Sequence, residues 1–219
     1  MKLKKSEKAF QYPQFECIDL TEPCVELVYK VFGDLLPADH GYGLFGAITN
    51  KKPEIRKLKD YAILTIPGFG DKRGKIALTK ESRCRVRATV SKIPLFCQLI
   101  GETLKIGTHS ITLGTPEIYQ LKPSSRLRAR IVVISNYQEP ESFLQAVQRQ
   151  LEALEVKAVA TVPLDRNGNF ARKTIKVKTN TKVGFSVELN RLSDEDSVKV
   201  QRCGIGNKRH MGCGFFQVF

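Results

Sequence analysis

Residues 204–219 read Gly204-Ile205-Gly206-Asn207-Lys208-Arg209-His210-Met211-Gly212-Cys213-Gly214-Phe215-Phe216-Gln217-Val218-Phe219, a glycine-rich loop followed by an apolar end. Glycine lets backbone N–H groups approach an anion closely, and the loop adds positive side chains. The spacing is neither that of a P-loop nor that of a dinucleotide fingerprint, which opens a helix. We therefore expect the loop to hold the phosphates of a polymer through Gly204, Gly206, Gly212, Gly214, Lys208 and Arg209. The alternative is a flexible turn into a last buried strand.

Upstream of this loop, the second half of the chain alternates between strand and helix patterns. Strands are predicted at 127–134, 156–162, 174–178 and 183–189. A strong apolar stripe predicts a helix over 142–154. Ser193, followed by three acidic residues, predicts the N-cap of a second helix that ends near Arg202. The order is β, α, β, β, α, β.

The first half repeats this order. Strands are predicted at 24–31, 61–66, 75–79, 83–90, 103–106 and 109–113, with 116–123 closing the half. A helix is predicted within 38–48, where Asp39 can act as the cap, and 95–100 fits either a short helix or a strand. The repeated order predicts an α+β protein of two tandem ferredoxin-like domains, residues 1–122 and 123–219.

Positive charge is spread over both halves. The chain has 219 residues and a net charge of +14, from 36 Lys and Arg against 22 Asp and Glu. Such a field favours a nucleic acid partner over a membrane, because no basic amphipathic helix is evident. There is no apolar run of transmembrane length and no signal-peptide core, so we expect a cytoplasmic protein. Six cysteines without a Cys-x2–4-Cys pair and three dispersed histidines predict free thiols, no metal and no cofactor.

Basic side chains recur at every second position of three predicted strands, which gives each strand one cationic face. These stretches contain no acid, so we favour a phosphate-binding track over an ordinary solvated face. Two loops add further cations. The residues expected to bind RNA here are Arg126, Arg128, Arg166, Arg172, Lys173, Lys176, Lys178, Lys72 and Arg73, and Arg83, Arg85, Arg87 and Arg130 follow the same pattern.

Three histidines are the candidates for proton transfer. RNA can be cleaved without a metal when a base activates the 2′-hydroxyl, a cation stabilises the phosphorane and an acid protonates the 5′-oxygen. His40 is predicted at an exposed helix start, where it could be a catalyst or a surface capping residue. His210 lies in the cationic loop, and His109 lies in a predicted strand where a structural role is expected.

Two distant stretches carry a resemblance to a known family. Leu36-Pro37-Ala38-Asp39-His40-Gly41-Tyr42-Gly43-Leu44-Phe45 and residues 204–215, with 104–109 and 192–197, resemble the CRISPR-associated protein six family of the RAMP superfamily. The resemblance is to its subfamily with a Leu-Pro-x-Asp-His-Gly-Tyr signature. It implies two ferredoxin-like domains and a catalytic histidine that maps onto His40, with Tyr42 and His210 as further candidates.

The resemblance also implies an activity. Such proteins are metal-independent endoribonucleases that bind the repeat of CRISPR precursor RNA, often a stem-loop. They cut once per repeat and leave a 2′,3′-cyclic phosphate and a 5′-hydroxyl. The alternatives are a non-catalytic crRNA-binding subunit of a CRISPR effector complex and a ribosome-associated RNA-binding protein. Effector subunits are further partners that the resemblance allows, as a monomer or a homodimer.

Overall fold

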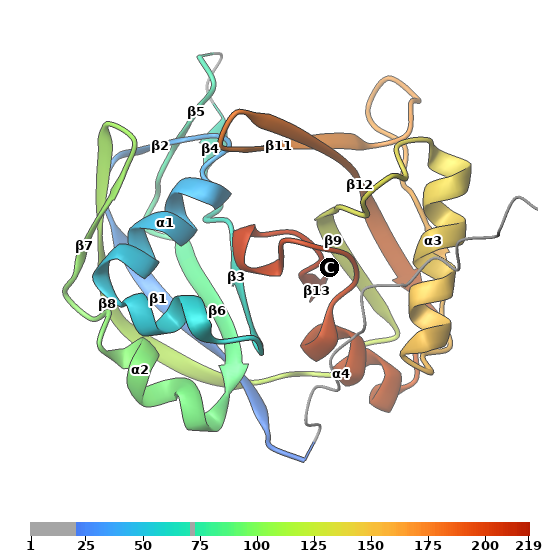
Figure 1. Cartoon of the computed structure of the whole chain (residues 1–219), viewed down its shortest axis with the longest axis horizontal. Helices are drawn as coiled ribbons and strands as arrows, with labels where there is room; N and C mark the ends of the chain where they lie inside the picture. Colours follow the sequence, from blue (N-terminus) through green and yellow to red (C-terminus); the bar gives the residue numbers. More distant parts are fainter. Residues whose placement is uncertain (1–20, 71–72) are drawn as a thin grey trace, which may run out of the picture.

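The computed structural model describes residues 21–70 and 73–219, so the predictions on Cys17 and Lys72 lie outside the described residues. Two large antiparallel sheets and one small sheet make up the fold (Figure 1). Helices α1 and α2 cover one face of the first large sheet, and α3 and α4 cover one face of the second.

The first large sheet has the strand order β3-β6-β1-β8-β7. Strand β7 is an addition that pairs with β8. The remaining order, β3-β6-β1-β8, is that of a ferredoxin-like sheet. Alternate residues of the central strand point into the core, so Leu27 and Tyr29 are fully buried. The elements of this half are β1 (Cys24–Phe32), α1 (Gly41–Lys51), η1 (Pro53–Lys57), β3 (Tyr61–Leu64), β6 (Arg83–Thr89), η2 (Val90–Lys92), α2 (Ile93–Cys97), β7 (Thr103–Ile106) and β8 (His109–Gln120).

The second large sheet has the order β10-β12-β9-β13, and β11 also pairs with β12. This is again the ferredoxin-like order, so the prediction of two tandem ferredoxin-like units is confirmed. The elements are β9 (Arg126–Val132), α3 (Pro140–Ala153), β10 (Val159–Thr161), β11 (Arg172–Val177), β12 (Asn180–Asn190), α4 (Asp194–Cys203), η3 (Arg209–Met211) and β13 (Phe216–Val218).

Three local predictions need correction or refinement. The stretch 75–79 does not join a large sheet; β5 (Lys75–Ala77) lies between β2 (Leu35–Pro37) and β4 (Phe69–Gly70) in the small sheet. Strand β8 continues to Gln120 through Pro116, which the sheet tolerates because the register with β1 shifts beside it. The ambiguous stretch 95–100 contains the end of α2 rather than a strand.

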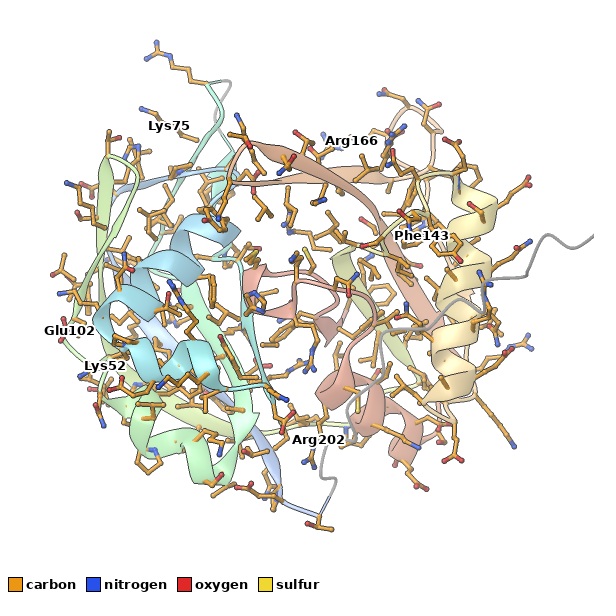
Figure 2. All side chains as sticks on the ribbon, viewed as in Figure 1. Lys52, Lys75, Glu102, Phe143, Arg166 and Arg202 are labelled. Atoms are coloured by element: carbon orange, nitrogen blue, oxygen red, sulfur yellow. The ribbon has the colours of Figure 1, made fainter. Side chains whose placement is uncertain are left out.

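Each large sheet has its own core. In the second core Phe143 points from α3 toward the sheet (Figure 2), and its ring centroid lies 4.8 Å from that of Phe185. The chain passes from the first sheet to the second between Gln120 and Arg126. The predicted cap of α4 is confirmed, because the Ser193 hydroxyl accepts a hydrogen bond of 3.1 Å from the Asp196 N–H.

Candidate active site

The glycine-rich loop lies between the two large sheets (Figure 1). Its turn η3 packs against β3, the edge strand of the first sheet, and against α1. Phe215 packs on Ala62 and Leu64 of β3. A Cβ atom on Gly41 would overlap the carbonyl oxygen of Met211. The two stretches that carry the family resemblance are therefore in direct contact, although they lie far apart in the sequence.

The expected phosphate grip by glycine N–H groups is not formed, because these groups are bonded within the protein. The N–H of Gly204 donates to the Val200 carbonyl at 2.8 Å and that of Gly212 donates to Arg209 at 3.3 Å. The Gly214 N–H donates to Ile131 at 2.8 Å. The Gly206 N–H donates to the Gln150 side chain, also at 2.8 Å.

These glycines serve close packing instead. Gly206 and Gly214 both have positive φ, and a Cβ on either would overlap a backbone carbonyl oxygen. For Gly214 the oxygen belongs to Ile205, and for Gly206 it belongs to Val133 of the segment after β9. Glycine is required here because the backbone of the loop touches the backbone around it.

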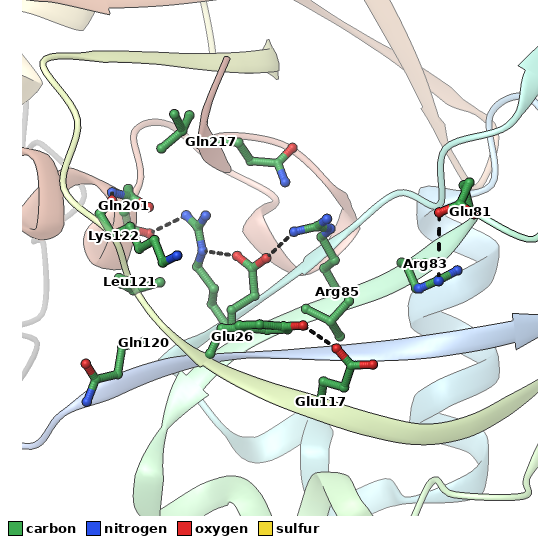
Figure 3. A pocket seen from close by; sticks show the side chains of 14 residues that line it. Glu26, Glu81, Arg83, Arg85, Glu117, Gln120, Leu121, Lys122, Gln201 and Gln217 are labelled. Atoms are coloured by element: carbon green, nitrogen blue, oxygen red, sulfur yellow. Dashed lines mark hydrogen bonds and ion pairs between the residues drawn. The ribbon is translucent and has the colours of Figure 1, made fainter.

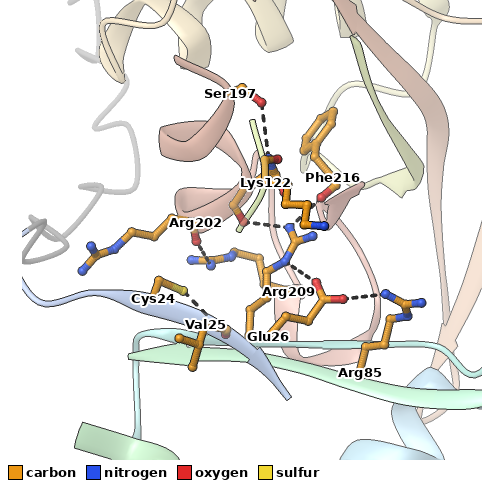
Figure 4. A network of polar contacts seen from close by, with 11 residues as sticks. Cys24, Val25, Glu26, Arg85, Lys122, Ser197, Arg202, Arg209 and Phe216 are labelled. Atoms are coloured by element: carbon orange, nitrogen blue, oxygen red, sulfur yellow. Dashed lines mark hydrogen bonds and ion pairs between the residues drawn. The ribbon is translucent and has the colours of Figure 1, made fainter. Parts of the chain in front are cut away.

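Arg209 also differs from the prediction of a phosphate contact. Its guanidinium donates to the Arg202 carbonyl oxygen within the interface (Figure 4). Burial lowers the pKa of Arg209, and its Nε atom is buried with no partner among the described residues. Lys208 begins η3 in a left-handed conformation and is half-buried. Both loop cations are half-buried, and of the two it is Arg209 whose guanidinium is bonded within the interface.

His40 is buried, which corrects the expectation of an exposed side chain. Only 2% of its surface is exposed. Its Nδ1 lies 2.8 Å from the Pro37 carbonyl oxygen, and the Ile66 N–H donates to its Nε2 at 2.9 Å. This pairing requires the neutral tautomer with the proton on Nδ1. Burial lowers the pKa of His40, and the positive charge of Arg130 lowers it further.

The residues around His40 contact several separate segments. The Ala38 N–H donates to the Gly74 carbonyl at 2.8 Å. Asp39 does not cap α1, whose N-cap position is His40; its carboxylate accepts a hydrogen bond of 2.6 Å from the Lys176 N–H of β11. The segment before α1 is thus tied to the small sheet, to the residues that follow β3 and to the second large sheet.

His210 lies in η3, the turn that packs against β3 and α1. Its ring centroid is 4.3 Å from that of Phe45 and 6.3 Å from that of Tyr61. Burial and the charges of the two preceding residues lower the pKa of His210 to about 4, so it is neutral at pH 7. Tyr42 is half-buried in the first turn of α1.

The cationic faces are not free of acids, because neighbouring strands supply them. Glu26 lies opposite Arg87 in the register of β1 and β6, and it binds Arg85 and Arg87 at 2.7 Å each (Figure 3). Glu188 binds Arg128 across β12 and β9. The absence of acids within each strand was therefore a poor guide to the charge of the assembled face.

Arg87 joins the two large sheets. It is 3% exposed, and its Nη1 donates to the carbonyls of Gln201 at 3.0 Å and Phe216 at 2.5 Å. Its guanidinium also lies 3.9 Å from the centroid of the Phe215 ring. The sequence of β6 does not distinguish the buried Arg87 from Arg83 and Arg85. The difference arises from the pairing of β6 with β1 and from the contact with the second half of the chain.

Two grooves open on the helix-free faces of the sheets. One, of about 580 Å³, is lined by both sheets and includes Arg83, Lys122 and Gln217 (Figure 3). The other, of about 640 Å³, lies beside β9 and the loop after β10. Exposed cations in or near these grooves and on β11 are Arg126, Arg128, Arg130, Arg166, Arg172, Lys173, Lys176 and Lys178, and Arg73 is exposed beside the small sheet.

The other side chains considered from the sequence are placed as follows. Cys24, Cys84, Cys97, Cys203 and Cys213 are free thiols. Within residues 21–70 and 73–219, no three His, Cys, Asp or Glu side chains are grouped as metal ligands. None of the helices in the described part of the chain is both long and apolar enough to span a bilayer.

A sequence model of the Cas6 CRISPR family matches residues 25–218. The chain belongs to the Cas6 family. A Cas6 relative, the CRISPR-associated endonuclease Cas6 of Myxococcus xanthus strain DK1622, is 33% identical over 195 residues, which span 88% of this chain and 80% of the relative.

Solved structures share the Cas6 fold at lower identity. A CRISPR-associated Cas6 protein superposes with a TM-score of 0.62 at 13% identity and covers 90% of this chain and 99% of its own. A RAMP protein described as binding different RNA substrates has a TM-score of 0.60 at 15% identity, with 90% and 99% covered. A Cas6-related protein from Pyrococcus furiosus has a TM-score of 0.59 at 16% identity, with 90% and 98% covered.

Proposed function

We propose that this chain is an endoribonuclease that binds the repeat of CRISPR precursor RNA and cleaves it once per repeat without a metal ion. The 2′-hydroxyl loses its proton and attacks the adjacent phosphorus, the P–O5′ bond breaks, and the leaving 5′-oxygen takes up a proton, so the products carry a 2′,3′-cyclic phosphate and a 5′-hydroxyl. Family membership and the named endonuclease activity of the Myxococcus xanthus relative support the reaction class. The observation that carries the location of the site is the contact between the segment around His40 and the glycine-rich loop.

In this proposal His40 is the general base. Its Nε2 carries a lone pair at neutral pH, because the proton resides on Nδ1, which is held by Pro37. Arg130 lies close enough to affect the pKa of His40 and supplies a cation for the phosphorane. RNA must displace the Ile66 N–H from Nε2 for the base to act. Leaving such a buried donor unpaired costs about 1–3 kcal/mol, which RNA binding can offset.

The RNA is held by the exposed cations rather than by the glycine backbone. Lys173 and Lys176 lie in β11, and Lys178 comes directly after it. The N–H of Lys176 donates to Asp39, the residue before His40. Arg166 and Arg172 extend this surface toward the groove beside β9. A repeat stem lying on β11 would therefore reach the segment that carries the base.

The decisive experiment uses the cognate repeat RNA in buffer that contains EDTA. We expect one cut, a cyclic phosphate on the 5′ fragment, and no cut when the scissile nucleotide has a 2′-deoxy ribose. Cleavage of the 2′-deoxy substrate, or complete dependence on an added divalent cation, would exclude the proposed reaction. A matched RNA of the same composition in scrambled order is the control for repeat selectivity.

A second candidate function is that of a crRNA-binding subunit that does not cleave. The observation that favours it is the complete engagement of the His40 ring, with both nitrogens paired to backbone groups and 2% of the residue exposed. Tight binding of the repeat with no product after prolonged incubation would select this function. The same cleavage assay, read beside a binding titration, separates the two candidates.

A further inference from the structure

The hairpin that connects β10 to β11 presents two apolar side chains to solvent. Leu164 is 61% exposed and Phe170 is 47% exposed. The two residues form an isolated antiparallel bridge. Hydrogen bonds from the Asp165 N–H to Asn169 at 2.7 Å and from the Ala171 N–H to Pro163 at 2.8 Å flank this bridge. Leu164 and Phe170 therefore form a non-hydrogen-bonded pair, whose side chains lie close together on one face.

The turn between these residues is held in one shape. The Asp165 carboxylate accepts hydrogen bonds from the N–H groups of Asn167 at 2.8 Å and Asn169 at 3.1 Å. Gly168 closes the turn with positive φ and donates to the Asp165 carbonyl at 3.1 Å. The loop projects from the edge of the second sheet, as the orange turn in Figure 1 shows. A ligand that binds here meets a preorganised surface, which lowers the entropic cost of binding.

The surroundings of the pair indicate what it binds. Leu164 lines the groove beside β9 together with Arg128, Arg130, Arg166 and Lys173. An apolar platform at the rim of a cationic groove fits a ligand with a flat apolar face and a negatively charged backbone. A nucleobase within a polynucleotide has both features.

We propose that Leu164 and Phe170 form a stacking site for one nucleobase of the bound RNA. This inference rests on the proposed RNA-binding function and names two residues that contribute to RNA affinity. Phe170 supplies the stacking face and Leu164 supports it, while Arg166 and Lys173 bind the adjacent phosphates. The site selects an RNA with an unpaired or terminal base at one fixed distance from the cut.

The test is a binding titration of the uncleavable 2′-deoxy repeat RNA with Phe170→Ala and Phe170→Trp. We expect the alanine variant to raise Kd about 5- to 150-fold and the tryptophan variant to stay within about threefold of wild type. Phe32→Ala is the control, because Phe32 is also an exposed phenylalanine, at 59%, but lies in the first sheet. An unchanged Kd for Phe170→Ala overturns the proposal.

Two further readouts distinguish stacking from a charge effect or a folding defect. Phe170→Ala should leave the slope of log K against log salt unchanged, whereas Arg166→Ala should reduce it by about 0.7 to 0.9. Abasic substitution along the repeat should reveal one position at which wild type loses affinity and Phe170→Ala does not. Additive losses at every position refute the stacking site. If wild type cleaves normally in that case, the proposed nuclease function stands; if wild type neither binds nor cleaves the repeat, both fail.

Discussion

Replacing His40 by glutamine separates a catalytic role from a structural one. The glutamine Oε1 can take the place of Nε2 and accept the hydrogen bond from Ile66, whereas the bond to the Pro37 carbonyl is lost. We expect the free energy of unfolding to fall by about 1–2 kcal/mol, which lowers Tm by about 2–8 °C for a chain of this size. If His40 is the base, the single-turnover cleavage rate should fall by about 10²- to 10⁴-fold. The Kd for repeat RNA should change little.

Two variants complete this experiment. His40→Ala leaves both backbone groups without the ring and should lower the free energy of unfolding by about 2–5 kcal/mol. Ser82→Ala is the matched control, because Ser82 is 2% exposed and its hydroxyl also joins two backbone groups, the Pro67 carbonyl at 2.7 Å and the Thr79 N–H at 3.0 Å. Ser82→Ala should lose stability without losing the catalytic rate, when both are measured well below Tm.

The pH profile gives an independent check on the same residue. Burial and Arg130 hold the pKa of His40 below its usual value of 6.5, so the neutral base persists to lower pH than a free imidazole would. The cleavage rate should therefore stay near its plateau at pH 6.5 and fall only in more acidic buffer. A His40→Gln enzyme that cleaves within about threefold of wild type would refute the role of His40 as base.

Three further predictions concern the interface and its titration. Arg87→Met should lower the free energy of unfolding by about 3–5 kcal/mol in urea titrations, because buried Glu26 keeps only Arg85 and the carbonyls of Gln201 and Phe216 lose their donor. Arg83→Met should cost less than about 1 kcal/mol, and equal effects of the two variants would contradict the bridging role. Gly214→Ala should prevent stable folding, whereas Gly46→Ala, with open space around the helix, should be neutral or stabilising by up to about 1 kcal/mol in thermal melts. The pKa of His210 is lowered to about 4 in the folded protein, so between pH 6.5 and pH 4 the unfolded chain binds more protons than the folded chain. Tm should therefore fall as the pH is lowered from 6.5 toward 4, and His210→Gln should make Tm depend less on pH.

Much of the fold was predictable because it rests on local periodicity. The alternation in β1 and the apolar stripe of α3 identify their buried faces without any tertiary information. The cap of α4 at Ser193 is likewise a local signal. The small sheet was missed because its strands are only two or three residues long and the pairing of β5 with β2 and β4 is set by tertiary contacts.

The candidate site was less predictable, because burial and pairing across the sheets decide it. Sequence placed His40 and the glycine-rich loop together only through the family resemblance. The burial of His40 depends on the Ile66 backbone, which lies 26 residues away. Asp39 and Arg87 bind backbone groups of the other half of the chain, in β11 and in α4 and β13 respectively, and backbone partners leave no trace in side-chain patterns.

The bridge at Arg87 has a consequence for how the molecule unfolds. Arg87 belongs to the first sheet, where Glu26 neutralises its charge. Its other N–H donors bind carbonyls of α4 and β13 in the second half of the chain. The loop after α4 covers β3, which would otherwise be an open strand edge. Neither half can separate without exposing unsatisfied donors and a free edge, so we expect the two halves to melt in one cooperative transition. When the halves are expressed as separate fragments, each lacks the surface that completes it, so we expect the fold to be recovered only when the two fragments are mixed.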